Sequence, residues 1–295
     1  MHDHSDQVIP LRHFRRWVSG ALVLLLLALV VRAFAQGDID WATVRQFFFS
    51  PVLVKGLGNT LLITVLAILM GLALGVVFAV MRLSKNPVTN AVASAYIWLF
   101  RGTPVYLQLL IWFNLALVFP TVNLLFWKAR MVDVMTPFLA ALLGLGFNEG
   151  AYMTEIVRGG VLSVDRGQLE AASTLGMTRL MAMRRIVLPQ AMRVIIPPIG
   201  NEFIGLLKTS SMASTIAFTE LLQRAQNIYF VNAKVIELLI VAAGWYMIVV
   251  TLFTLVQNRV EARFNRGQGH EPPPGFGRRL WRNMTRTRAA AGGAQ

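Results

Sequence analysis

The sequence predicts an all-α, polytopic membrane protein with six transmembrane helices, and three observations support this fold class. Hydrophobic residues make up 56% of the 295 positions and charged residues only 14%, a balance typical of membrane proteins. Six predominantly apolar segments are each about as long as a membrane-crossing helix. Lys and Arg are unevenly distributed, with 20 in segments expected inside the cell and 5 in segments expected outside. This bias places both termini in the cytoplasm.

The same composition excludes several classes of protein. The formal net charge of +14 does not indicate nucleic-acid binding, because the basic residues cluster at the ends of apolar segments and in the C-terminal tail. Cysteine is absent, which excludes disulfides and thiolate metal sites. No Gly-rich phosphate loop ending in Lys-Ser or Lys-Thr occurs, so any ATP is bound by another chain. No catalytic or metal-binding residue is expected, because all histidines lie in terminal segments: His2, His4, His13 and His270.

The first expected helix covers residues 17–35 and follows a polar N-terminus. A cleavable signal peptide is the alternative interpretation, because a basic start precedes an apolar core over residues 18–31. Arg32 argues against cleavage, since it falls inside the expected cleavage region, and it can instead reach the membrane surface. Both interpretations place residue 36 outside the cytoplasm.

The next two spans are expected over residues 57–81 and 104–119. Gly71 and Gly75 give the second span a face of small residues that suits close helix packing. Residues 86–103 form an amphiphilic stretch on the inner side, and Thr103 is expected to cap the third span with Pro104 in its first turn.

Polar residues mark the fourth and fifth spans, expected over residues 137–157 and 194–217. Helices this polar must face a cavity or other helices. At about 1.5 Å per residue, Glu149 and Lys208 both lie near the membrane midplane, so we expect them to flank a pathway, either paired or meeting a zwitterionic substrate. The alternative is that each pairs with backbone or a neighbouring subunit and only fixes packing. The pathway candidates are Asn148, Glu149, Tyr152, Glu202 and Lys208.

The chain closes with a sixth span over residues 234–257 and a basic tail over residues 259–295, which is expected to be disordered. Between the fourth and fifth spans, residues 159–193 carry too many charges to cross a bilayer cheaply. Leu169, Ala172 and Leu175 fall on one helical face, and Gly176 predicts the end of that helix. Thr178 is expected to cap a second short helix, and Pro189 to end it.

The 159–193 segment also carries a spaced pattern of seven residues: Glu170, Ala171, Ala172, Gly176, Ile186, Leu188 and Pro189. This pattern resembles the EAA loop of the membrane subunits of ABC importers. Residues 52–258 as a whole resemble their five-helix core, with residues 1–35 as an extra N-terminal helix. Arg101-Gly102-Thr103-Pro104 is similar to the polar amino-acid branch of these permeases, and Lys208-Thr209-Ser210-Ser211 resembles another family segment.

The resemblance implies a transport subunit of the bacterial cytoplasmic membrane with no covalent chemistry of its own. Its EAA residues would contact a partner ATPase that binds ATP and Mg²⁺. The other implied partners are a second permease subunit, identical or different, an extracytoplasmic amino-acid-binding protein and membrane lipid. The implied substrates are polar or charged amino acids. The alternatives are a permease for methionine or another small organic solute, and an ion-driven secondary transporter with Glu149 as its ion site.

Overall fold

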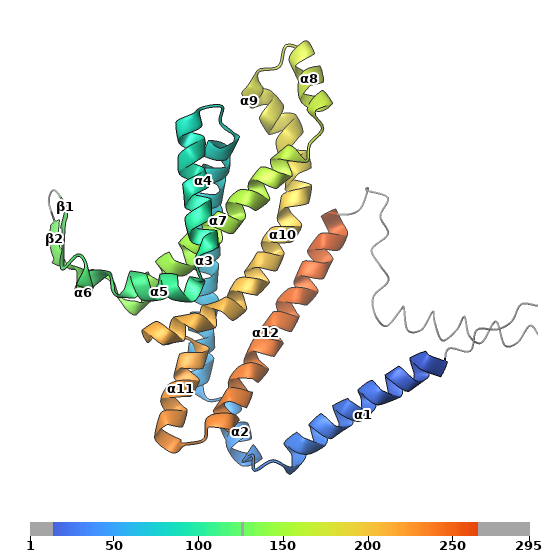
Figure 1. Ribbon diagram of the computed structural model, residues 1–295, viewed down its shortest axis with the longest axis vertical. Helices are drawn as coiled ribbons and strands as arrows, with labels where there is room; N and C mark the ends of the chain where they lie inside the picture. The colour runs from blue at the N-terminus through green and yellow to red at the C-terminus, as the bar shows by residue number, and fades with distance from the viewer. Residues whose placement is uncertain (1–13, 125–126, 265–295) are drawn as a thin grey trace, which may run out of the picture.

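Helices form nearly the whole body of the protein (Figure 1), whose computed structural model describes residues 14–124 and 127–264. By length and composition, three of the described helices can cross a membrane: α1 (Phe14–Gln36), α3 (Pro51–Leu83) and α12 (Val235–Phe264). Two more are comparably long but more polar, α7 (Pro137–Leu162) with 26 residues and α10 (Leu188–Thr209) with 22. The helices confirm the predicted all-α membrane fold. All four histidines and the basic tail from residue 265 lie outside the described residues.

The expected third span is wrong as a single helix. Residues 104–119 hold only the short helix α5 (Val105–Phe113) and the 3-10 turn η1 (Leu115–Leu117). Nine residues extend only about 14 Å, which is too short for a bilayer. The preceding helix α4 (Pro87–Gly102) packs on α3 and α7 instead of lying at the surface. Its Tyr96 stacks on Phe78 of α3 at 3.8 Å between ring centroids. Because only two residues separate α4 from α5, the two helices form one broken segment.

Close packing of α3 against α7 forms the centre of the bundle. A Cβ added at Gly71 would lie 2.8 Å from Glu149 Cγ, and one added at Gly75 would collide with Met153 Cβ. Gly71 and Gly75 therefore form the predicted small-residue contact face, which lets the two backbones approach closely. Buried apolar side chains from both helices, such as Ile63 on α3, continue this contact into the main core.

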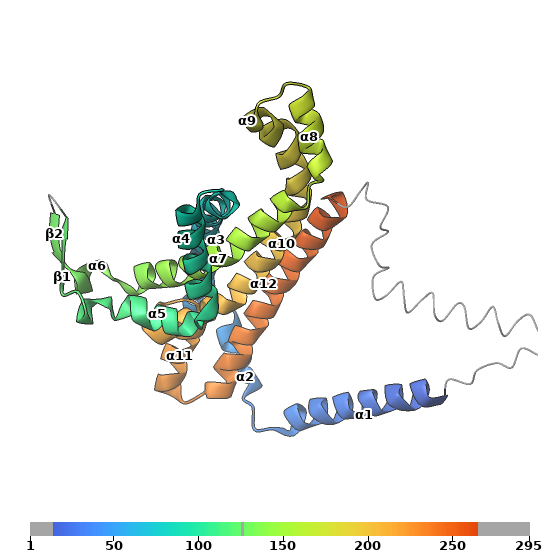
Figure 2. The same cartoon turned by 45° about the horizontal axis from the view of Figure 1, so that its top comes forward.

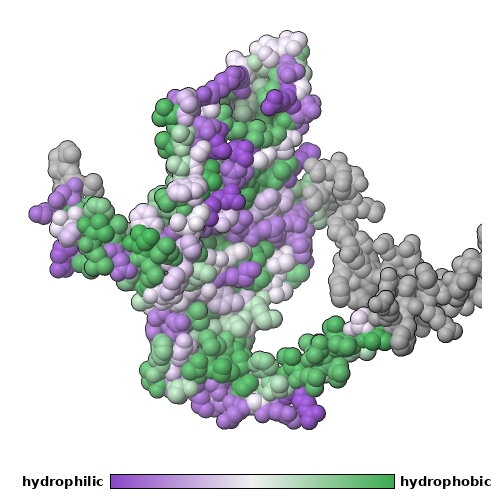
Figure 3. Space-filling model, in the orientation of Figure 1, coloured by the Kyte–Doolittle hydropathy of each residue, from purple (hydrophilic) through white to green (hydrophobic). Residues whose placement is uncertain are grey.

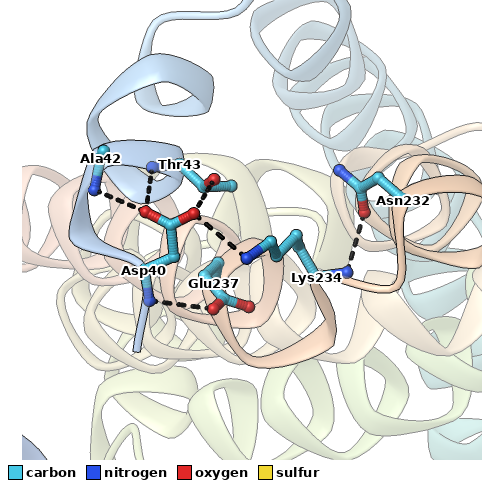
Figure 4. Close-up of polar contacts among 6 residues, drawn as sticks. All are labelled: Asp40, Ala42, Thr43, Asn232, Lys234 and Glu237. Carbon is cyan, nitrogen blue, oxygen red and sulfur yellow. Dashed lines mark hydrogen bonds and ion pairs between the residues drawn. The ribbon is translucent and has the colours of Figure 1, made fainter. Parts of the chain in front are cut away.

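At the end of the bundle near α12's first turn, a polar cluster fastens helix α2 (Trp41–Phe48) to α12 (Figure 4). Asp40 caps α2 by accepting from Thr43 N and Thr43 Oγ1, and it pairs with Lys234 at 3.1 Å. Its backbone N–H donates to Glu237 at 3.0 Å. The hydroxyl and amide of Thr43, followed by Lys234, lower the pKa of Asp40 to about 2. By contrast, α1 is exposed along residues 17–36 and presents a continuous hydrophobic surface (Figure 3).

A small antiparallel hairpin, which the sequence did not predict, follows η1. Strand β1 (Thr121–Leu124) pairs with β2 (Trp127–Arg130), with Thr121 opposite Arg130. The one-turn helix α6 (Met131–Val134) then leads into α7, where Thr136 accepts from Leu139 N. Figures 1 and 2 show the hairpin projecting from the bundle on the side away from α1. The remaining elements are α8 (Arg166–Thr174), α9 (Arg179–Ala182), the π-turn η2 (Met183–Val187), the 3-10 turn η3 (Ser210–Ile216) and α11 (Leu221–Asn232).

Candidate functional site

A cavity of about 580 Å³ lies where the α4–α5 break faces α7 and α10. It brings together segments that are far apart in the sequence, and hydrophilic residues gather on the face of the bundle between α4 and α12 (Figure 3). Four of the five expected pathway residues line it, together with the whole Arg-Gly-Thr-Pro turn. Its lining is Arg101, Gly102, Thr103, Pro104, Val105, Leu145, Asn148, Glu149, Tyr152, Glu202, Gly205, Leu206 and Thr209.

The α4–α5 break is built around Pro104. A helix continuing through this point would bond the Phe100 carbonyl to the N–H of residue 104, which proline lacks. Two side-chain amides supply the missing donors: Gln108 Nε2 at 2.9 Å and Asn148 Nδ2 at 2.8 Å. Gln108 Nε2 also donates to the carbonyl and hydroxyl of Thr103. Backbone carbonyls inside a membrane protein need hydrogen-bond donors. Gln108 and Asn148 supply them and thereby stabilise the turn that lines the cavity.

Gln108 has a role that its sequence context did not predict, and the predicted capping of the third span by Thr103 is wrong. Thr103 ends α4 instead of capping α5, because its hydroxyl donates back to the Leu99 carbonyl at 2.8 Å. Gln108 is 5% exposed within a strongly apolar helix. The signal in the sequence was its position, four residues after Pro104. A buried amide there can donate to the Phe100 carbonyl, which Pro104 leaves without a backbone donor.

Arg101 is the positively charged residue in the cavity lining. Its guanidinium carbon lies 5.0 Å from the centroid of the Tyr152 ring, a cation–π contact that orients the side chain. Among the described residues, no ion pair involves Arg101. The planar guanidinium is therefore available to bind a carboxylate in two-point fashion.

Two carboxylates face the same cavity. Glu149 on α7 is 5% exposed, and its Oε1 is a buried atom with no hydrogen-bond partner in the described structure. Glu202 on α10 is half-buried. A buried acceptor without a partner is costly, which makes Glu149 a candidate to bind a donor that enters the cavity.

Lys208 does not join this group. It is exposed, and no ion pair links it to Glu149 among the residues that the structure describes. The expected pairing is therefore absent from this structure. The reason is helical geometry, because the α10 residues that line the cavity share one face at spacings of three and four, and Lys208 lies off that face. That face comprises Glu202, Gly205, Leu206 and Thr209.

The 159–193 segment forms a knob at one end of the bundle, made of α8, α9 and η2 (Figures 1 and 2). Gly176 ends α8 with a left-handed φ of 74°. Its N–H donates to Ser173 O and that of Met177 donates to Ala172 O, the paired bonds of a Schellman motif. Thr178 then caps α9 by accepting from Met181 N. Both predictions, of a helix stop and of a cap, are confirmed.

One other expectation for the knob is wrong. Pro189 does not end a helix; it lies in the first turn of α10, where its missing N–H is harmless. The chain therefore runs from α9 through η2 into α10 with no intervening loop. Leu169 and Leu175 do not pack beside buried Ala172, because they are 40% and 81% exposed.

The knob stands on a small apolar core shared by α7, η2 and α10. Ile195 packs so closely against Gly160 that an added Cβ would collide with it. Near the same end of α7, Glu155 and Arg158 pair at 2.6 Å. Of the residues with the EAA pattern, Ala172 is buried and Ile186 half-buried, while the exposed ones are Glu170, Ala171, Gly176, Leu188 and Pro189.

A helical membrane bundle with a cavity lined by polar residues and a protruding knob defines the class: a membrane transport protein. The particular family follows from comparison with known proteins. Residues 71–266 match the family described as "Binding-protein-dependent transport system inner membrane component", and the chain belongs to it. It is a permease component of an ABC importer and a bacterial membrane protein. This membership overturns the alternative of an ion-driven secondary transporter.

Relatives at high coverage agree. The chain is 41% identical over 261 residues to the arginine transport system permease protein ArgU of Corynebacterium glutamicum, covering 88% of this chain and 83% of that one. It is 32% identical over 227 residues to the glutamine transport system permease protein GlnP of Escherichia coli, covering 77% and 98%. A solved amino acid ABC transporter with histidines matches with a TM-score of 0.68 at 36% identity, covering 77% of this chain and all of that one.

Proposed function

We propose that this permease subunit imports a cationic amino acid, and the cavity charges carry the proposal. An amino acid presents one carboxylate and one ammonium group, and a cationic one adds a second positive group. The cavity offers the complementary set: the Arg101 guanidinium and the carboxylates of Glu149 and Glu202. The partnerless Glu149 Oε1 would gain a donor when the substrate enters. The relative named for arginine transport supports the same substrate class.

The knob is the proposed contact with a partner ATPase, which would bind ATP and Mg²⁺. Its exposed Leu175 and Leu180, 81% and 79% exposed, form an apolar surface that a partner subunit would cover. Gly176 shapes this surface by ending α8. The concentration of Lys and Arg on this side supports a cytoplasmic location for the knob and both termini.

A second permease subunit is the proposed neighbour of Lys208. This residue lies at membrane depth and is exposed on α10, and a charged group there is expensive against lipid. A subunit contact at this face gives it a polar environment, and it remains a pathway candidate on that surface. An extracytoplasmic binding protein would deliver the amino acid to the opposite end of the bundle.

Reconstitution tests the proposal. The chain, co-purified with its ATPase, would be placed in liposomes with the binding protein, and import of labelled arginine, glutamine and glutamate compared. We expect arginine to be preferred and Arg101→Ala to abolish import of all three. Glu149→Gln with Glu202→Gln should reduce the preference for arginine over glutamine. Preferred import of glutamate, or a chain that purifies without an ATPase, would refute the proposal.

A further inference from the structure

Helix α10 connects the knob directly to the cavity, and it contains a weak point. It begins at Leu188, next to η2, and its far half carries Glu202 into the cavity lining. Pro197 and Pro198 lie inside it. Each lacks an N–H, so the helix loses two of its own hydrogen bonds at successive positions. Prolines inside a helix are the usual site of bending, and this pair lies between the knob and the cavity.

A polar contact from α12 meets α10 on the cavity side of this weak point. Gln257, 8% exposed, donates from Nε2 to the Pro197 carbonyl at 2.8 Å and to Glu261 Oε1 at 2.9 Å. Glu261 Oε1 also accepts from Asn201 Nδ2 at 3.3 Å. The two α12 residues therefore contact α10 at the prolines and one turn beyond them.

The contact depends on a missing side chain. Gln257 occupies the place that a Cβ on Gly200 would take, and an added methyl would collide with its side-chain amide. Gly200 thus opens a notch in α10 into which Gln257 fits. A buried amide in such a notch needs its hydrogen bonds, so the fit and the bonds to Pro197 and Glu261 support each other.

We infer that Gln257 and Glu261 act as a clasp on the proline pair and determine how movement of the knob reaches the cavity. Gln257 is a positioning residue for transport, because it touches α10 and not the substrate. With the clasp closed, α10 moves as one rod, and a shift at η2 displaces Glu202. With the clasp open, α10 bends at its prolines and the shift is lost. This inference rests on the ATPase contact proposed above.

The test uses the complete reconstituted importer, with its ATPase and binding protein. Gln257→Met keeps the side-chain length and removes the donor, while Gly200→Ala leaves Gln257 intact and expels it from the notch. Gly58→Ala is the matched control, because a Cβ added there meets nothing within 4 Å. The readout is the number of amino acids imported per ATP hydrolysed, measured beside the assembly of the complex.

We expect both variants to assemble and hydrolyse ATP while import per ATP falls about 5- to 150-fold, the effect of losing the two hydrogen bonds of Gln257 from a two-state equilibrium. The double variant should be no worse than either single one, because both remove the same contact. The control should keep the original ratio. An unchanged number of amino acids imported per ATP, or failed assembly of both variants, would overturn this inference but not the proposed function. A complex with the original sequence whose ATPase does not drive import would overturn the proposed function as well.

Discussion

The Phe100 carbonyl offers a sharp test of how the cavity turn is held. It accepts from Gln108 at 2.9 Å and from Asn148 at 2.8 Å, because Pro104 supplies no donor. The changes are Gln108→Leu, Asn148→Leu and both together. Either single change leaves the carbonyl with one donor, whereas the double change leaves it with none. The double variant should therefore be worse than the sum of its parts.

The size of this excess follows from the contacts. Gln108 loses three hydrogen bonds and Asn148 one, and each net bond contributes about 0.5–1.5 kcal/mol. A buried carbonyl with no donor adds a penalty of about 1–3 kcal/mol, which only the double variant incurs. That excess corresponds to about 5- to 150-fold in an equilibrium constant. Because Arg101 and Thr103 of this turn line the cavity, the extra free-energy cost of the double variant should also lower kcat/KM for import.

The assay is kcat/KM for import in liposomes, converted to free energies in a double-mutant cycle. Gln223→Leu is the control, because this exposed side chain donates only to nearby Asn227, at 3.2 Å. It should leave import unchanged. If the double variant equals the sum of the singles within about 0.5 kcal/mol, the Phe100 carbonyl does not depend on its two donors, and this account of the turn is wrong.

Three further predictions concern packing, the knob and pH. Gly71→Ala should destabilise the α3–α7 contact by about 1–3 kcal/mol, because the new Cβ meets Glu149 Cγ at 2.8 Å, while Gly58→Ala should not; thermal unfolding of the purified complex measures both. Gly176→Glu should reduce co-purification of the ATPase and leave membrane insertion intact, because a φ of 74° strains any residue but glycine; equal ATPase recovery would refute this. The pKa of Asp40 is lowered to about 2 from an ordinary 3.8, so its stabilisation is present above the ordinary value and is lost as pH falls toward 2. Hydrogen exchange of the α2 amides should be constant between about pH 5 and 8, apart from intrinsic rates, and Asp40→Asn should accelerate it at pH 7.

Hydropathy predicted where the long helices lie but not where they break. The second and fourth spans fall within α3 and α7, and the fifth and sixth fall within α10 plus η3 and within α12 except for one residue each. The prediction of the third span failed because the apolar residues of α5 resemble a membrane helix, whereas the polar residues of α4 do not. Polar side chains of α4 bond within their own helix; Ser94, for example, donates to the Asn90 carbonyl at 2.7 Å. The hairpin failed for a related reason, since four-residue strands carry too little alternation to detect.

Polar residues in apolar helices were a sound guide to the cavity, because burial forces such groups to share an environment. Glu149, Asn148, Tyr152 and Glu202 were found in this way, and all four line it. Counting residues along a helix gives depth but not direction. Lys208 is exposed and lies off the α10 face that lines the cavity.

Gln257 illustrates the opposite case, a residue whose sequence context hides its part in the structure. A polar residue at the end of an apolar span is ordinarily explained by the membrane surface, where long side chains reach water. Gln257 is instead buried against α10 and bonded to the Pro197 carbonyl. What distinguishes the two situations is the absent side chain of Gly200, 57 positions earlier in the chain. Prolines and a glycine close together weaken a helix and open its backbone to a neighbouring side chain, but the sequence does not state which helix supplies that side chain.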